Sequence, residues 1–332
     1  MHSDVTPTCS VVFPVYDEAG NLELLYQRVH DELSRSGVSY EMIFVDNGSS
    51  DGSLEIIKEL SHKDSNVHFE SLSRNFGHQG ALFAGMNYTR GNAVITMDAD
   101  LQHPPSLIPK MIQLWQDGSE VVFTTKKNHR LNPITGVQVK MFYWLMSKLS
   151  GLKLSFGQSD FRLIDRKVVT ALLSINEYRK FLRGTVQWLG FRQTGIEYQV
   201  DERYSGISKF SYKALFSFAV DGILAFSSLP LRWFTAAGVL VAAAGLCYAI
   251  AAIIIGILSK LGGGMTVPPG WATLAATITF FGGVQLLGIG ILGEYLSRVF
   301  EQTKGRPVFI VREFSNSLEK DFPDLGRVLW SK

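Results

Sequence analysis

The first 125 residues alternate short apolar segments with amphipathic stretches of helical period. This alternation is typical of βαβ units, and it predicts an α/β fold with a Rossmann-like, mainly parallel sheet and helices on both faces. The expected strands span residues 9–16, 40–47, 68–73, 93–100 and 120–125. Polar clusters follow several of them. Because open α/β sheets bind ligands at the carboxyl ends of their strands, we expect the functional site there.

Two later stretches have the periodicity of amphipathic helices. From Val137 onward, apolar residues recur at helical spacing while lysines occupy other faces, so this helix is expected to lie on a membrane surface or to pack against a core. Residues 208–226 space polar side chains four apart and lead into a strongly apolar region. We therefore expect an interfacial helix there.

Two long segments near the end of the chain carry no charge, at about residues 233–258 and 271–293. About 20 apolar residues suffice to cross a bilayer, so both are expected to be transmembrane helices. The connection between them holds a single Lys260, whereas arginines and lysines flank the outer ends of the pair. The positive-inside rule then predicts a multi-pass protein of the cytoplasmic (inner) membrane, with both termini in the cytoplasm.

These patterns divide the 332 residues into four parts. We expect a cytoplasmic catalytic domain over 1–206, an interfacial helix over 207–230, a transmembrane pair over 231–299 and a cytoplasmic tail over 300–332. The formal net charge is +2 without a basic stripe, so nucleic acid is not an expected partner. The only cysteines, Cys9 and Cys247, make neither a disulfide framework nor a cysteine metal site plausible.

A pair of carboxylates ends the fourth expected strand. Strand alternation would aim Asp98 and Asp100 toward the same side, where their oxygens could bind Mg²⁺ or Mn²⁺ together with a phosphate. An Asp-x-Asp pair alone is a weak signal, and a solvated loop is the alternative. The surrounding motifs favour the metal site.

Those motifs resemble the family-2 glycosyltransferases, which have the GT-A fold. The similar segments are FPVYDE (13–18), VDNGSSDG (45–52), RNFG (74–77), DADLQHPP (98–105) and DFRL (160–163). Later segments resemble the branch that acts on polyisoprenyl phosphates, which includes bactoprenol glucosyltransferases and dolichyl-phosphate mannose synthase: RYSGISKF (203–210), PLR (230–232), GEY (293–295) and RP (306–307). The resemblance spans nearly the whole chain. It implies hexose transfer from a nucleotide sugar to a polyprenyl phosphate such as undecaprenyl phosphate, with UDP-glucose favoured and GDP-mannose as the nearest variant.

The resemblance also implies roles for individual residues. The nucleotide sugar would be bound by Pro14, Tyr16, Glu18, Asn47, Arg74, Asp98 and Ala99, and the metal by Asp98, Asp100 and Gln102. Asp100 and Asp160 are the expected catalytic residues. Two departures stand out, since Asn47 replaces the aspartate that usually reads the nucleobase, and Asp17 replaces an asparagine.

Cations near the expected membrane helices suit the phosphate of a lipid acceptor. The candidates are Lys126, Lys127, Arg130, Arg203 and Lys209. Attraction to anionic lipids is the alternative role for each of them. Because a phosphate monoester is largely a dianion at neutral pH, it needs little help from a base. Asp160 is therefore expected to orient groups or to pair with a cation, although the family suggests a general base.

In-line attack by that phosphate on the anomeric carbon would invert its configuration, and no residue pairing argues for a covalent intermediate. Because Asn47 and Asp17 depart from the family pattern, a weakly active membrane subunit that binds nucleotide sugars is an alternative function. A processive synthase is disfavoured because a QxxRW-type motif is missing. The transporter reading is disfavoured because neither apolar segment has an ionisable residue at its middle. Assembly into a homo-oligomer stays open.

Overall fold

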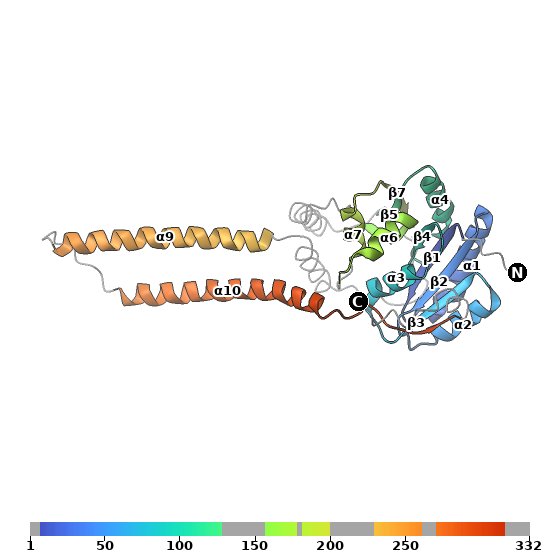
Figure 1. Ribbon diagram of the computed structural model, residues 1–332, viewed down its shortest axis with the longest axis horizontal. Coiled ribbons are helices and arrows are strands. Elements are labelled where there is room, and N and C mark those ends of the chain that lie inside the picture. Colours follow the sequence, from blue (N-terminus) through green and yellow to red (C-terminus); the bar gives the residue numbers. More distant parts are fainter. Residues whose placement is uncertain (1–6, 128–156, 178–180, 200–228, 261–269, 316–332) are drawn as a thin grey trace. The chain divides into compact units, whose positions relative to one another are not determined.

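The computed structural model describes residues 7–127, 157–177, 181–199, 229–260 and 270–315 (Figure 1). Contacts between Cα atoms divide the chain into two compact units. The first comprises Met1–Phe218 together with Gly305–Lys332, and the second comprises Ala219–Lys304. The amphipathic stretches expected from Val137 and over residues 208–226 lie outside the described residues.

The described part of the first unit contains one sheet with the strand order β7-β5-β6-β4-β1-β2-β3-β8. Its strands are β1 (Cys9–Val15), β2 (Tyr40–Asp46), β3 (Val67–Leu72), β4 (Ala93–Thr96), β5 (Val121–Lys127), β6 (Gln158–Asp165), β7 (Gln193–Gln199) and β8 (Val311–Phe314). Strands β1 to β4 are parallel, β6 runs antiparallel between β4 and β5, and β8 is antiparallel to β3. The predicted mainly parallel α/β sheet is confirmed.

Helices cover both faces of this sheet (Figure 1). They are α1 (Ala19–Ser36), α2 (Ser53–Lys63), α3 (Gly77–Asn87), the 3-10 turn η1 (Pro105–Leu107), α4 (Ile108–Gln116), α6 (Arg166–Ser174) and α7 (Leu182–Trp188). The apolar stripe of α1, which includes Leu22, Leu25 and Val29, packs with α2 and α4 on one face. Helices α3, α6 and α7 pack on the other face. Successive residues such as Val11 and Val12 therefore enter different cores, which explains why β1 and β2 are largely apolar.

The fourth strand is shorter than its prediction. β4 ends at Thr96, four residues before the expected end at residue 100. Beyond it Leu101 has φ +62°, in the left-handed region, and aspartates favour such loops over strands. The prediction that strand alternation aims Asp98 and Asp100 was therefore wrong, because a loop positions them.

Part of the expected C-terminal tail forms a strand of this sheet. β8 lies along the edge of β3, where Ser73 N donates to Ile310 O at 2.9 Å and Ser315 N donates to Phe69 O at 2.9 Å. Lys58 on α2 pairs with Glu313 at 2.7 Å. A strand this short has no sequence signature of its own. Its effect is to cover the backbone groups that a β3 edge would otherwise expose.

The described part of the second unit consists of two long helices, α9 (Leu229–Lys260) and α10 (Trp271–Thr303), and each contains one of the predicted spans. Large apolar side chains on both are exposed, among them Leu240 and Leu286. The Phe234 ring leaves no room for a side chain at Gly288. Within the described residues, the segment Phe280–Thr303 is long and apolar enough to cross a membrane, whereas the apolar segment Trp233–Gly245 is shorter. The second span stays a prediction.

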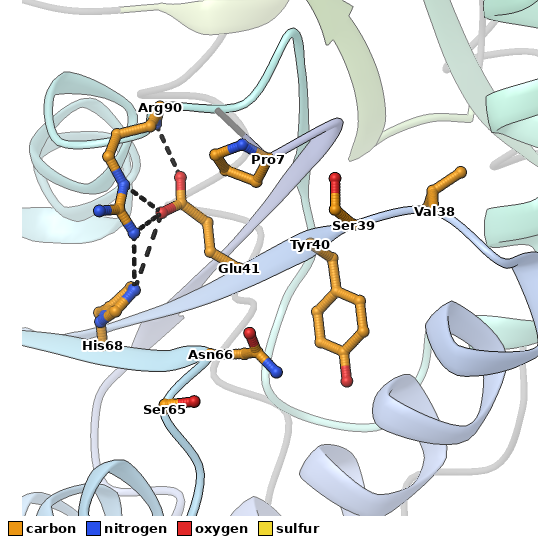
Figure 2. Close-up of a pocket in the computed structure, with 9 residues that line it drawn as sticks. All are labelled: Pro7, Val38, Ser39, Tyr40, Glu41, Ser65, Asn66, His68 and Arg90. Atoms are coloured by element: carbon orange, nitrogen blue, oxygen red, sulfur yellow. Dashed lines mark hydrogen bonds and ion pairs between the residues drawn. The ribbon is translucent and has the colours of Figure 1, made fainter. Parts of the chain in front are cut away.

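Two buried glutamates in neighbouring strands have opposite surroundings. Glu41 on β2 accepts hydrogen bonds from Ser10 Oγ at 2.6 Å and from Arg90 N at 2.7 Å, and it pairs with Arg90 Nη2 at 2.8 Å. Figure 2 shows this pair beside His68 in a pocket at the amino ends of the strands. Glu70 on β3 is fully buried, and within the described part of the chain neither of its carboxylate oxygens has a hydrogen-bond partner. Burial raises the pKa of Glu70 well above its usual range.

The same substitution is expected to have opposite effects at these two glutamates. Glu70→Gln removes a buried carboxylate without partners and should raise the thermal midpoint at pH 7.5 by a few degrees, on the order of 1 kcal/mol. Glu41→Gln weakens a buried ion pair and should lower the midpoint. The measurement is thermal unfolding of the detergent-solubilised full chain.

The pH dependence supplies the control. Because its raised pKa lets the folded chain keep a proton that the unfolded chain releases, Glu70 costs stability as pH rises above the unfolded value of about 4.3. The gain from Glu70→Gln should therefore vanish below that pH. Equal losses from both substitutions at pH 7.5 would contradict the assignment.

Candidate active site

The loops after the four parallel strands meet at one edge of the sheet. Residues 16–18 follow β1, 47–52 follow β2, 73–76 follow β3 and 97–102 follow β4. Parallel strands place their carboxyl ends together, so the predicted site residues of these loops share an edge. Strand β6 runs antiparallel beside β4 and adds Asp160.

His78, in the first turn of α3, links two of the predicted carboxylates. Its Nε2 lies 3.4 Å from Asp98 Oδ1 and 3.5 Å from Asp160 Oδ2. Loss of solvent opposes charge on the ring, but the hydrogen bond to Asp160 and the charges of Asp98 and Asp160 raise the pKa of His78 to about 9. The ring therefore carries a proton between two carboxylates at neutral pH.

Asp160 is a buried carboxylate held by three surrounding cations. Arg183 on α7 donates through Nε to Oδ1 at 2.8 Å and through Nη2 to Oδ2 at 2.9 Å, which is a bidentate pair. Arg162, fully buried on β6, lies 3.8 Å from the same carboxylate. Burial favours the neutral acid, yet Arg183, His78 and Arg162 together keep the pKa of Asp160 well below its usual range. A carboxylate with so low a pKa is a weak proton acceptor, which suits an orienting group better than a general base.

His103 supports the loop after β4, which contains Asp98 and Asp100. It is buried, its ring stacks on Phe161 at 5.3 Å between centroids, and its Nε2 lies 2.8 Å from Ser159 Oγ. Burial lowers the pKa of His103. The neutral ring accepts from Asp98 N at Nδ1, at 3.3 Å, so the proton sits on Nε2 and donates to Ser159.

The loop chemistry fits a hard divalent cation. Asp98 Oδ1 is buried and, among the described residues, has an ion pair with His78 at 3.4 Å but no hydrogen-bond partner. Asp100 Oδ1 accepts from Gln102 N at 3.1 Å, which folds the loop back on itself. Among the described residues, no group of three or more His, Cys, Asp or Glu side chains is arranged to hold a metal. Mg²⁺ usually binds proteins through one or two carboxylates plus the phosphates of a substrate, and Asp98 and Asp100 match that mode.

The predicted residues on the nucleotide side have varied surroundings. Tyr16 is 39% exposed, whereas Pro14 is buried within β1 and Ala99 is buried beside the core. Glu18 is the N-cap residue of α1, and its carboxylate accepts from Asn21 Nδ2 at 2.5 Å. Glu18 thus has the structural role of a helix start in addition to any contact with a nucleoside.

Arg74 lies in the turn after β3, and Asn47, which follows β2, contacts that turn. The Arg74 guanidinium lies 4.2 Å from the centre of the Phe76 ring, and the residue is exposed. Asn47 is buried, and both polar atoms of its side chain contact the backbone or side chain of residues 75 and 76. The side chain of Asn47 is therefore already engaged within the protein.

The predicted acceptor cations are only partly described. Lys126 lies on β5 and is half-buried. Its charge helps to lower the pKa of His103, so Lys126 is within electrostatic range of the loop after β4. Arg130, Arg203 and Lys209 lie outside the described residues.

Sequence reasoning missed three side chains that meet at this site. His78 directly follows the RNFG motif, and this position could have indicated that it lies near the site. No sequence pattern pointed to Gln79 or Arg183. Gln79 Nε2 faces Asp160 Oδ2 at 3.5 Å, and its Oε1 accepts from Leu182 N at 2.9 Å, so it joins α3 to α7.

Comparison with known proteins identifies the family. Glycosyl transferase family 2 matches residues 10–173, which include all of these loops. A bactoprenol glucosyl transferase of Shigella phage SfX is 36% identical over 91% of this chain and 98% of that protein. The chain belongs to glycosyl transferase family 2. Within this family, an uncharacterized glycosyltransferase of Synechocystis sp. is 38% identical over 93% of this chain and 96% of its own length.

The family assignment confirms the resemblance seen in the motifs, and it makes the chain a glycosyltransferase. Among solved structures, a mannosyltransferase from Pyrobaculum calidifontis in complex with GDP-Man and Mn²⁺ has 14% identity and a TM-score of 0.46, over 90% of this chain and 87% of that one. A likeness of that degree carries no inference about the donor or the metal of this glycosyltransferase.

Proposed function

We propose that this glycosyltransferase moves a hexose from a nucleotide diphosphate sugar, with UDP-glucose favoured, to undecaprenyl or another polyprenyl phosphate at the cytoplasmic face of the membrane. The observation that carries the proposal is the 36% identity, over 91% of the chain, to a protein named bactoprenol glucosyl transferase. An apolar helix of membrane-spanning length and many exposed apolar side chains support an acceptor that stays in a bilayer.

The sheet supports an even number of membrane crossings. Strand β1 precedes the apolar helices and β8 follows them, yet both belong to one sheet, so the chain must return to the side on which it began. If α10 crosses the bilayer, a second crossing is needed, and α9 is the helix that we propose for it. This favours the two-span hairpin (233–258 and 271–293) between a catalytic domain (1–206) with its interfacial helix (207–230) and a cytoplasmic C-terminal part (300–332).

In the proposed reaction the acceptor phosphate attacks the anomeric carbon in line. A bond forms between that carbon and a phosphate oxygen, the bond to the β-phosphate of the donor breaks, and its electron pair leaves with the nucleoside diphosphate. The configuration inverts, and no proton has to be removed because the attacking phosphate is already largely a dianion. Lys126, with Arg130, Arg203 and Lys209, would attract the acceptor phosphate.

The remaining roles follow from the site. A divalent cation, Mg²⁺ or Mn²⁺, would be held by Asp98, Asp100 and Gln102 and would neutralise charge on the departing diphosphate. Tyr16, Glu18 and Arg74, together with Pro14 and Ala99, would bind the nucleotide sugar at the carboxyl ends of the parallel strands. Asp160 is ionised and fixed by Arg183, so it would orient the reacting groups without taking a proton.

The proposal predicts metal-dependent labelling of a lipid. Membranes containing the full chain, given radiolabelled UDP-glucose and undecaprenyl phosphate, should form a labelled lipid. A chelator should lower its formation by about 100-fold or more, and added Mg²⁺ or Mn²⁺ should restore it. Labelled GDP-mannose and membranes lacking the chain are the controls. Preference for GDP-mannose would select the mannosyl variant, and absence of labelled lipid with every donor would refute the proposal.

A further inference from the structure

Asn47, which follows β2, uses both polar atoms of its side-chain amide in hydrogen bonds to the turn that follows β3. Its Oδ1 accepts from Phe76 N at 2.9 Å and its Nδ2 donates to Asn75 Oδ1 at 3.1 Å. The side chain is 3% exposed. The motif resemblance implied that Asn47 contacts the nucleotide, but its amide faces neighbouring residues of the protein.

The partners determine which way this amide must point. Phe76 N–H can only donate, so an oxygen must face it. Asn75 Oδ1 also accepts from Gly77 N at 2.8 Å, so its orientation is set and the group that faces it from Asn47 must donate. Position 47 thus needs an acceptor and a donor at once. An amide supplies both, whereas the carboxylate usual in the family supplies only acceptors.

Close packing joins the same two loops. Gly48 has φ +76°, and a Cβ added there would lie 2.9 Å from Arg74 C and 3.0 Å from Asn75 N. A side chain at residue 48 would push the turn after β3 away from the loop after β2. The two loops are therefore interlocked by backbone contact as well as by the Asn47 amide.

The turn held in this way ends at Phe76, two residues before His78 and three before Gln79. Helix α3 begins at Gly77, and the next two residues are His78, between Asp98 and Asp160, and Gln79, which contacts Asp160 and the start of α7. A displacement of the turn would move both side chains. Displacements of about 1 Å at a catalytic site are known to cost about 100-fold in rate.

We propose that Asn47 and Asn75 form a clamp that positions His78 and Gln79 against Asp98 and Asp160, and that Asn47 is a positioning residue and does not read the nucleobase. The proposal rests on the proposed function for its rate measurement.

The test combines rates with nucleotide binding, using the full chain in detergent with Mn²⁺. Asn47→Ala and Asn75→Ala should each lower kcat by about 10- to 100-fold, and the double variant should be no slower than the slower single variant. The KM for the donor should change less than about threefold. Asn92→Ala, which removes an exposed amide before β4, is the matched control and should match the wild type.

The binding arm separates the clamp from nucleobase reading. Asn47→Asp should lower kcat while leaving the dissociation constants of UDP and GDP, and their ratio, within about threefold of the wild type. A shifted ratio, or additive effects of Asn47→Ala and Asn75→Ala, would overturn the clamp. Absence of transfer by the wild type would instead refute the proposed function, and the unchanged UDP and GDP ratio would still decide between clamp and base contact. A wild type that neither transfers nor binds would refute both.

Discussion

Asp100→Asn is expected to reduce sugar transfer by about 1,000-fold or more at saturating Mn²⁺. The substitution keeps the shape of the side chain but removes one of the two charges in the loop after β4. Several kcal/mol of stabilisation of the departing diphosphate would be lost with the cation, and each 1.36 kcal/mol is a factor of ten in rate. Initial rates of lipid labelling measure the effect.

Asp117→Asn is the matched control for this prediction. Asp117 is an exposed residue at the end of α4, away from the carboxyl ends of the parallel strands, and its substitution should leave the rate unchanged. A variant Asp100→Asn that retains a tenth of the wild-type rate would show that this carboxylate holds no essential cation. That result would favour the weakly active, nucleotide-sugar-binding subunit instead.

Arg183→Gln is expected to lower kcat by about 100-fold through its effect on Asp160. The buried Asp160 carboxylate would lose two charge-assisted hydrogen bonds, and its orientation against His78 would no longer be fixed. Arg183→Lys should recover only part of the rate, because an ammonium group cannot form the bidentate pair. Arg192→Gln, an exposed arginine just before β7, is the control.

The pH profile provides a second readout for Arg183. Burial favours the protonated form of Asp160, and Arg183 is the largest influence that opposes it, so its loss raises the pKa of Asp160. The rate of Arg183→Gln should therefore fall more steeply toward acid pH than the wild-type rate, because the protonated fraction of Asp160 increases there. Parallel profiles for the two proteins would contradict a role of Arg183 in keeping Asp160 ionised.

Local pattern was enough to predict most of the sheet. Strands β1, β2 and β3 lie within a residue of their predicted bounds. Buried parallel strands tend to be apolar segments, as β1 and β2 largely are, although β3 also buries His68, Glu70 and Ser71. The error at β4 has a physical cause, because the segment after Thr96 remains apolar at Met97 and Ala99 but leaves the sheet. Strand β8 was missed because four residues at a sheet edge depend on pairing with β3 and carry little pattern of their own.

The sequence by itself determined the fold class, the family motifs, the carboxylates Asp98 and Asp100 and the apolar segments, because periodicity and short motifs are local properties. Only the tertiary structure decided which side chains share the site. His78 meets Asp160 from 82 residues away, Arg183 meets it from 23, and Asn47 clamps a turn 28 residues later. Contacts of this kind arise from the crossing of helices and strands, so no spacing in the chain encodes them. The structure also shows that the Asn47 amide already bonds to residues 75 and 76, which is the basis of the proposed clamp. Only folded neighbours reveal such hydrogen bonds.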